Sequence, residues 1–212
     1  MRNHEGQARA INSEEFQRVI DTTLETSDFS LRDCAILAVS FYAGLRAMEI
    51  AALNIEDIVS QDGEIKNTIT LRKAGTKGGM GGVAYLSNPN LREHLSRYIV
   101  EKRCYSATVL KRSSKTTGSG WAGELEGAVF ISRVGKRFSP SSMSRLFTRL
   151  YTTAGLEGCS SHTGRRSLCK NLNGNGVSIY NIQKIMRHAD ISQTVRYIDV
   201  DEDLLANICS TV

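Results

Sequence analysis

Four residues in the C-terminal quarter of the sequence have the types and spacing for chemistry on a phosphate group. His162 and Arg165 stand three positions apart, and His188 precedes Tyr197 by nine positions. If a helix begins near His162, residues three apart lie on one face, so an imidazole and a guanidinium can reach one anion at its N-terminus. A short turn and one further helical turn can bring the Tyr197 phenol to that anion as a candidate covalent nucleophile.

Each of these residues also has an ordinary structural explanation. A His-x-x-Arg pair is common by chance, and a tyrosine on an amphipathic helix usually packs with its hydroxyl at the rim. The prediction of a catalytic site therefore depends on partners elsewhere in the chain.

Arg46 is the first such partner. A helix that begins near Arg46 leaves this side chain in the first turn, where it can project from the rim. Glu49, three residues later, can pair with Arg46 or orient a neighbouring group of the site. The alternative is a solvated arginine at a helix start.

A glycine-rich segment supplies a candidate lysine. Residues 73–82 read KAGTKGGMGG, and so many glycines make a chain entropically costly to order. The segment is therefore either a mobile loop or a loop that settles on a ligand. Lys77 is placed to deliver a proton to a phosphate oxygen. Lys73 is the alternative for that role, and a surface lysine without a function is the other explanation.

The composition predicts one domain and a polyanionic partner. The chain has 212 residues, 41% of them hydrophobic, which suits a single substantial core. Its net charge is +5, and residues 66–116 carry eleven Lys or Arg against two Glu. So basic a segment, without a long apolar helix face, favours nucleic acid over a membrane. The candidate DNA-binding residues are Lys73, Lys111, Arg112, Lys115 and Arg166.

Cysteine usage and the N-terminal sequence indicate a cytoplasmic protein. The five cysteines are odd in number and show neither a CxxC motif nor Cys/His ligand spacing, so we interpret them as reduced thiols rather than metal ligands. The N-terminus, MRNHEGQARA, is polar, and the longest apolar run, residues 34–43, is too short to span a bilayer.

The elements that would position the candidate residues are mainly helical. Helical periodicity and capping residues predict helices that begin after Asn12, near Arg46, near Asn88 and near Ser139, and helices over residues 31–43, 165–172, 178–186 and 192–198. Short strands are predicted over residues 58–59, 68–72, 83–86 and 128–132. Residues 106–127, rich in Ser, Thr, Gly and Lys, are predicted to form a loop or a disordered excursion. The predicted fold class is α+β, mainly α, with one small sheet.

The order of these motifs resembles the tyrosine recombinase (phage integrase) family over roughly residues 12–200. GLRAMEIAAL, the hairpin lysine, HTGR and MRHADISQTVRY occur in the family's order. The resemblance implies a helical catalytic domain with a small antiparallel sheet, double-stranded DNA as the substrate, and no cofactor or metal. The implied catalytic residues are Arg46, Lys77, His162, Arg165, His188 and Tyr197, with Glu49 in support.

The resemblance also implies a reaction. Arg46 and Arg165 would hold a phosphodiester, Tyr197 would attack it to form a 3′-phosphotyrosyl link, and Lys77 would protonate the departing 5′-oxygen. His162 would assist proton transfer and His188 would hydrogen-bond to the phosphate. The expected function is site-specific recombination, whether integration, excision or inversion. The alternatives are a non-cleaving accessory factor that assists a fuller recombinase, and a type IB topoisomerase-like enzyme.

The sequence departs from the family pattern beside two of the motifs. Gly164 and Arg166 stand where an aliphatic residue and a histidine are usual on either side of the second arginine. Met186 and Arg187 replace the usual Leu-Gly before the third-motif histidine. We expect these departures to alter packing and local charge around the phosphate without changing the reaction type.

The resemblance further implies a domain organisation. We expect a flexible arm over residues 1–11 and one catalytic domain over residues 12–212, without the separate core-binding domain of most relatives and similar in size to the fimbrial-switch invertases. Residues 200–212 are expected to form a tail helix whose apolar stripe docks on a neighbouring protomer. The expected assembly is a homo-tetramer on two DNA sites, with a partner recombinase or an accessory DNA-bending protein as a possible addition.

Overall fold

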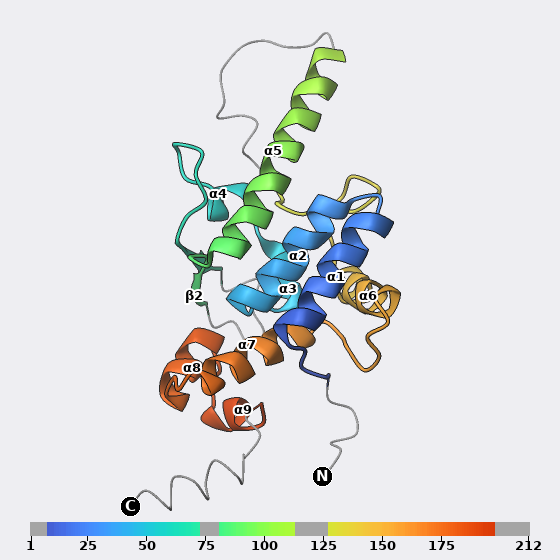
Figure 1. Cartoon of the computed structure of the whole chain (residues 1–212). Coiled ribbons are helices and arrows are strands. Elements are labelled where there is room, and N and C mark those ends of the chain that lie inside the picture. Colours follow the sequence, from blue (N-terminus) through green and yellow to red (C-terminus); the bar gives the residue numbers. More distant parts are fainter. Residues whose placement is uncertain (1–7, 73–80, 113–126, 198–212) are drawn as a thin grey trace, which may run out of the picture.

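Helix α2 (Ser30–Ala43) lies at the centre of the molecule. The computed structural model describes residues 8–72, 81–112 and 127–197, with residues 105–112 as backbone. The α2 sequence, SLRDCAILAVSFYA, is apolar nearly all round, and such a helix is stable only when it is covered on every side. Helices α1 (Ser13–Thr26), α5 (Pro89–Arg112) and α7 (Thr163–Gly174) pack against it, and Figure 1 shows α2 between α1 and α5.

The start of α1 follows the sequence prediction. The Glu15 backbone N–H donates to Asn12 Oδ1 at 2.8 Å, and the Asn12 N–H donates to Glu15 Oε2 at 3.0 Å, which is a reciprocal capping box. Phe16 is buried and stacks on Phe41 of α2, with ring centroids 3.9 Å apart. Val19 and Ile20 are also buried, whereas Leu24, one turn after Ile20, is exposed.

Gly44 ends α2 and directs the chain into α3 (Ala47–Ala52). Its φ of +62° is a left-handed conformation that glycine adopts without strain. A Cβ on Gly44 would also lie 2.8 Å from Leu168 Cδ2 of α7. A glycine at position 44 therefore suits both the left-handed turn and the close approach of Leu168 from α7.

The sheet of the described residues has two antiparallel strands, β1 (Thr68–Leu71) and β2 (Gly82–Tyr85). Thr68 pairs with Tyr85 and Leu71 with Gly82, which confirms the prediction of paired strands on either side of the glycine-rich segment. Residues 73–80 of that segment lie outside the described residues.

The predicted strand over residues 58–59 is wrong. Ile58 is the last residue of α4 (Ile55–Ile58), the Val59 N–H continues that turn by donating to Ile55 O at 2.8 Å, and Val59 forms only a single bridge with Ile65. A two-residue apolar run carries no periodicity that could separate a helix end from a strand.

The predicted strand over residues 128–132 is also wrong. This segment makes single bridges, from Ala128 to Asn54 and from Ile131 to Arg137, rather than a ladder. Val129 and Phe130 are fully buried. The apolar run therefore predicts burial correctly, but burial alone does not show that a segment is a strand.

Helix α5 is longer than predicted. It continues to Arg112, through part of the stretch that was expected to be a loop, because a helix already started at Pro89 extends through Ser and Thr at a small cost per residue. Residues 113–126 lie outside the described residues. The inward face of α5 consists of buried Leu91, Leu95, Tyr98 and Ile99.

The C-terminal helices form a smaller unit beside the main core. Helix α6 (Pro140–Thr153), capped by Ser139, belongs to the main core, whereas α7 and α8 (Ile179–Met186) share a second cluster of Cys169, Ile182 and Met186. Helix α9 (Ile191–Val195) packs against α8, and Figure 1 shows α7, α8 and α9 together at one end of the molecule. Helix α9 ends before the predicted boundary at residue 198.

Residues 8–11 do not form the free arm that the sequence predicted. The Arg9 N–H donates to Gly158 O at 2.9 Å, and the N–H of buried Ile11 donates to Ser167 Oγ at 2.8 Å. These bonds hold the segment against the start of α7. Within the described ranges no helix combines the length and apolarity needed to cross a bilayer.

We predict that Gly164→Ala destabilises the protein and that Gly174→Ala, in the same helix, does not. A Cβ on Gly164 would lie 2.6 Å from Ser40 Oγ and 2.9 Å from the Ser40 carbonyl carbon, whereas a Cβ on Gly174 meets nothing within 4 Å. Overpacking against backbone should lower the free energy of unfolding by about 1–3 kcal/mol. Urea unfolding of both variants measures this, and a Gly164→Ala variant as stable as Gly174→Ala would contradict the close α2–α7 contact.

Candidate active site

Arg46 and Glu49 lie at the first turn of α3. Arg46 is the N-cap residue, with an extended backbone. Its N–H donates to Glu49 Oε2 and its Nη1 donates to Glu49 Oε1, both at 2.8 Å. The Arg46 side chain keeps 22% of its surface exposed, whereas that of Glu49 keeps 1%. The pairing predicted from their spacing is therefore present, and the carboxylate is the buried member.

Glu49 also pairs with a second arginine. Arg187, at the end of α8, donates from Nη2 to Glu49 Oε2 at 3.2 Å. Burial by itself would raise the pKa of Glu49, but the charges of Arg187, Arg46 and Arg165 and the Arg46 N–H outweigh it and lower that pKa below its ordinary value. Glu49 is therefore a carboxylate at neutral pH.

Arg165 reaches the same place from α7. Its side chain is buried, and Nη1 and Nη2 donate to the carbonyl oxygens of Gly44 and Met186. The guanidinium thereby joins the α2–α3 corner to the end of α8. Burial, with the nearby charges of Arg46 and Arg187, lowers the pKa of Arg165 to about 9. The group remains a cation at neutral pH, but one whose charge is poorly compensated.

His188 follows α8 and is buried. Its Nδ1 lies 2.8 Å from Thr194 Oγ1 of α9. Burial is the largest cause that lowers the pKa of His188 to about 3, and the positive charges of Arg165, Arg46 and Arg187 lower it further. The imidazole is therefore neutral at physiological pH. In the tautomer whose Nδ1 accepts from the Thr194 hydroxyl, the ring proton is on Nε2, which can donate a hydrogen bond.

Tyr197 lies beside His188 at the edge of the second cluster. The two ring centroids are 5.5 Å apart, and the half-buried Tyr197 ring packs against the small core of α7 and α8. The Cζ atom of Arg166 lies 5.4 Å from the Tyr197 ring centroid, in cation–π range. The turn after α9 thus brings the Tyr197 ring beside His188. That its hydroxyl reaches an anion held by His162 and Arg165 stays a prediction.

His162 occupies the N-cap of α7 and is exposed, with its Nδ1 3.4 Å from Ser161 Oγ. The prediction that α7 starts near His162 is confirmed. Two hydrogen bonds hold the first turn of α7 in place. The Ser160 N–H donates to Thr163 Oγ1 at 2.9 Å, and the Arg166 N–H donates to His162 O at 3.0 Å.

Comparison with known proteins decides the family. The sequence profile of the phage integrase family matches residues 9–203. The chain belongs to the phage integrase family. It is 28% identical over 85% of its length to tyrosine recombinase XerC of Rhodospirillum centenum and 25% identical over 93% to tyrosine recombinase XerD of Oceanobacillus iheyensis. It spans 46% and 60% of the lengths of those two relatives.

Solved structures share the fold. XerA recombinase superposes with a TM-score of 0.67 at 22% identity, covering 95% of this chain and 64% of that one. XerH recombinase in a post-cleavage complex with its difH substrate gives 0.64 at 18% identity, covering 99% of this chain and 55% of that one. The fold predicted from the sequence is therefore confirmed as that of phage integrase catalytic domains.

Several predicted site residues of this phage integrase family member are not placed. Lys73, Lys77 and Lys115 lie outside the described residues, and the side chains of Lys111 and Arg112 are not described. The β1–β2 pairing does fix where residues 73–80 leave and rejoin the domain, because Leu71 and Gly82 are opposite each other.

Several basic side chains in the described part of residues 66–116 form hydrogen bonds to backbone carbonyls of the domain itself. Lys66 Nζ donates to Glu56 O, Arg103 Nη2 to Gly63 O, and Arg92 Nη1 to Ile65 O. Lys102 Nζ donates to the carbonyls of residues 128 and 129. Arg166, another predicted DNA-binding residue, donates to Ala8 O at 2.6 Å. These bonds tie loops to helices, a role that a count of charges does not reveal.

Sequence reasoning missed Arg187 and Thr194 as members of the site. Thr194 falls within a motif that was recognised, and its position six residues after His188 is the signal that could have found it. Arg187 was noted only as a departure from the family pattern. Within the described part of the chain, no cluster of three or more His, Cys, Asp or Glu side chains is arranged to hold a metal ion.

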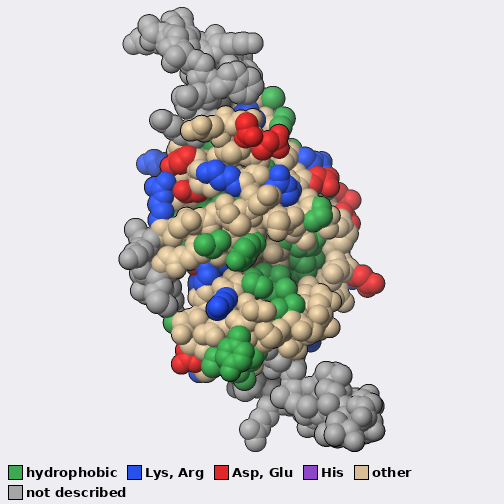
Figure 2. Space-filling view, turned by 90° about the vertical axis from the view of Figure 1, so that its left-hand side faces the viewer, with side chains coloured by type: hydrophobic (Ala, Val, Ile, Leu, Met, Phe, Trp, Pro, Cys, Tyr) green, Lys and Arg blue, Asp and Glu red, His purple; other side chains and the backbone are tan. Residues whose placement is uncertain are grey.

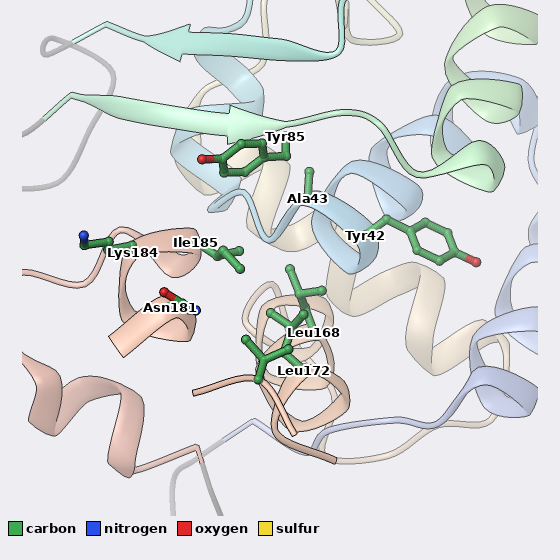
Figure 3. Close-up of a pocket in the computed structure, with 9 residues that line it drawn as sticks. Tyr42, Ala43, Tyr85, Leu168, Leu172, Asn181, Lys184 and Ile185 are labelled. Carbon is green, nitrogen blue, oxygen red and sulfur yellow. The ribbon is translucent and has the colours of Figure 1, made fainter. Parts of the chain in front are cut away.

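A separate groove of about 470 Å³ lies between the end of α2, β2, α7 and α8. Figure 3 shows Leu168 and Leu172 on one side and Tyr85 on the other, with Ile185 and Lys184 at its α8 edge. Figure 2 shows hydrophobic side chains gathered near the middle of a face of the molecule. None of the predicted catalytic residues lines this groove.

We predict that His188 stays neutral well below pH 6. Its pKa of about 3 in the folded protein lies below the value of about 6.5 expected when the chain is unfolded. Between these values the unfolded chain binds a proton that the folded chain does not, so stability falls as the pH is lowered through this window. NMR titration of the His188 ring tests the pKa, and His188→Gln should flatten this part of the stability profile. Titration of His188 above pH 5.5 would contradict the described burial.

Proposed function

We propose that this chain carries the catalytic centre of a site-specific DNA recombinase that breaks and rejoins strands through a 3′-phosphotyrosyl link. The observation that carries the proposal is the excess of buried positive charge. Arg46, Arg165 and Arg187 surround one carboxylate, Glu49, and the adjacent His188 is neutral. A phosphodiester supplies the missing negative charge, and it gains more in the transition state.

The arginines suit a phosphodiester in geometry as well as charge. A guanidinium has five N–H donors in a planar fork that matches two phosphate oxygens. Arg46 uses Nη1 on Glu49 and remains partly exposed, so its outer donors can face DNA. Arg165 uses one bond from each Nη on a carbonyl and keeps further N–H groups. The two would bind the non-bridging oxygens.

The proposed chemical step also uses Tyr197, His162, His188 and Lys77. The Tyr197 Oη attacks phosphorus, a P–O bond to Tyr197 forms, and the bond from phosphorus to the 5′-oxygen breaks. The phenolic proton passes to His162, the 5′-oxygen takes a proton from Lys77, and neutral His188 donates Nε2–H to the phosphate. Lys73 is the alternative donor to the 5′-oxygen.

The reverse step rejoins strands. A 5′-hydroxyl of another strand attacks the phosphotyrosyl bond, Tyr197 leaves, and a new phosphodiester forms with no net change in bond type. The reaction therefore needs no nucleotide cofactor. Integration, excision and inversion are the same strand exchange on differently arranged sites.

Assembly on DNA follows from the same proposal. Strand exchange needs two DNA sites and four cleavages, which fits a homo-tetramer on double-stranded DNA, with or without a partner recombinase or DNA-bending protein. The side chains of Lys111, Arg112 and Lys115 would contact the DNA backbone. Residues 198–212 follow Tyr197 directly and carry apolar residues at helical spacing, so we propose that they dock on a neighbouring protomer. The groove in Figure 3 is an apolar surface suited to them.

We predict that Tyr197→Phe abolishes the covalent adduct and keeps DNA affinity within about twofold. Only the nucleophilic oxygen is lost, since the ring that packs on His188 remains. A nicked suicide substrate that carries the target site, run on a denaturing gel, measures the adduct. Tyr180→Phe, at an exposed position on α8, is the matched control and should form it normally. An adduct in Tyr197→Phe that disappears in Tyr180→Phe would assign the nucleophile to Tyr180.

A further inference from the structure

Arg187 occupies a position that ordinary packing does not favour. It has a left-handed backbone, with a φ of +52°, and within the described ranges it is the one non-glycine residue with a positive φ. Its side chain is only 8% exposed. A left-handed conformation is strained for an arginine, and burial of its charge adds a further cost. Glycine would remove both costs, so contacts of the side chain must offset them.

Arg187 donates to the same acceptors as Arg46 and Arg165, the two arginines proposed to clamp the phosphodiester. Its Nη2 donates to Gly44 O at 3.1 Å and to Glu49 Oε2 at 3.2 Å. The Gly44 carbonyl also accepts from Arg165, and the Glu49 carboxylate also accepts from Arg46. Arg187 is therefore the shared neighbour of two arginines that come from different helices.

The stem of Arg187 also meets the β-hairpin. A Cβ built on Gly82 of β2 would lie 2.8 Å from Arg187 Cδ and 3.1 Å from Cγ. Gly82 thus leaves the space that the stem fills. Gly82 pairs with Leu71 at the loop end of the hairpin. The Arg187 stem therefore holds this end of the hairpin next to the arginine cluster.

We propose that Arg187 is a positioning residue of the candidate active site, which holds Glu49 and the Gly44 carbonyl in place for Arg46 and Arg165 and seats the β1–β2 hairpin against them. This inference rests on the proposed function for its catalytic consequence. Its geometric part concerns the protein without DNA. In this proposal Arg187 acts through Glu49 and the Gly44 carbonyl, because its Nη2 donates to both of these acceptors and its Nη1 donates to Ile185 O.

The test is a double-mutant cycle on cleavage. Arg187→Met keeps the stem and removes the charge, and it should lower the single-turnover rate of adduct formation about 10- to 100-fold at saturating DNA, with affinity unchanged within twofold. Arg187→Lys should recover part of the rate. Glu49→Gln should lower the rate of adduct formation by a similar factor. The double variant should react no more slowly than the slower single variant, because both changes break the same Arg187–Glu49 ion pair. Arg145→Met, an exposed arginine on α6, controls for the loss of one positive charge.

Three results would overturn the inference. An unchanged rate in Arg187→Met would show that the residue is a bystander. A double variant whose rate falls by the product of the two single-variant factors would show that Arg187 does not act through Glu49. A loss of DNA affinity larger than that of Arg145→Met, with a reduced salt dependence, would make Arg187 a phosphate ligand instead.

A measurement without DNA separates this inference from the proposed function. In Arg187→Met, the ¹⁵Nε–¹Hε NMR signals of Arg46 and Arg165 should shift and exchange faster with water than in the wild type, while urea unfolding confirms a folded chain. If the wild type forms no adduct but these signals change, the positioning role stands and the recombinase proposal fails. Unchanged signals would refute the positioning role, whatever the activity.

Discussion

The structure of the site depends on one buried carboxylate among arginines. Glu49 accepts from the Arg46 guanidinium through Oε1 and from Arg187 and the Arg46 N–H through Oε2, and the charge of Arg165 acts on it as well. An unpaired carboxylate at 1% exposure would be strongly unfavourable, and so would the arginines without it. The cluster still holds more positive than negative charge. It is therefore stable enough to fold and remains suited to an added anion.

Two glycines allow the helices that carry these residues to meet. Gly44 turns the chain from α2 to α3 and offers its carbonyl to Arg165 and Arg187, while leaving room for Leu168 and Met186. Gly164 brings α7 against the backbone of α2 one residue before Arg165. Helix α2 is thus both the centre of the core and the surface on which the site is assembled. Stability and function are coupled there, because a side chain at Gly164 would clash with the α2 backbone one residue before Arg165.

The sequence was most informative where the determinants are local. The Asn12–Glu15 cap, the Gly44 helix end and the Arg46–Glu49 pair each depend on residues within a few positions, and each is present. It was least informative where a contact spans the chain. Arg187 finds Glu49 138 positions away, from a left-handed conformation that sequence rules reserve for glycine. Lys66 and Arg103 belong to the basic segment whose charge predicted a nucleic-acid partner, yet they bond to backbone carbonyls of the domain.

The measurement that tests the phosphodiester clamp most directly is single-turnover cleavage by Arg165→Lys. Lysine keeps the positive charge but cannot donate to two phosphate oxygens in a fork while also bridging the Gly44 and Met186 carbonyls. At saturating suicide substrate, in buffer containing EDTA, the rate of adduct formation should fall about 10²- to 10³-fold while DNA affinity stays within a few-fold of wild type. Cleavage at the wild-type rate would contradict the account, because the most deeply buried arginine of the cluster would then play no part in the chemistry.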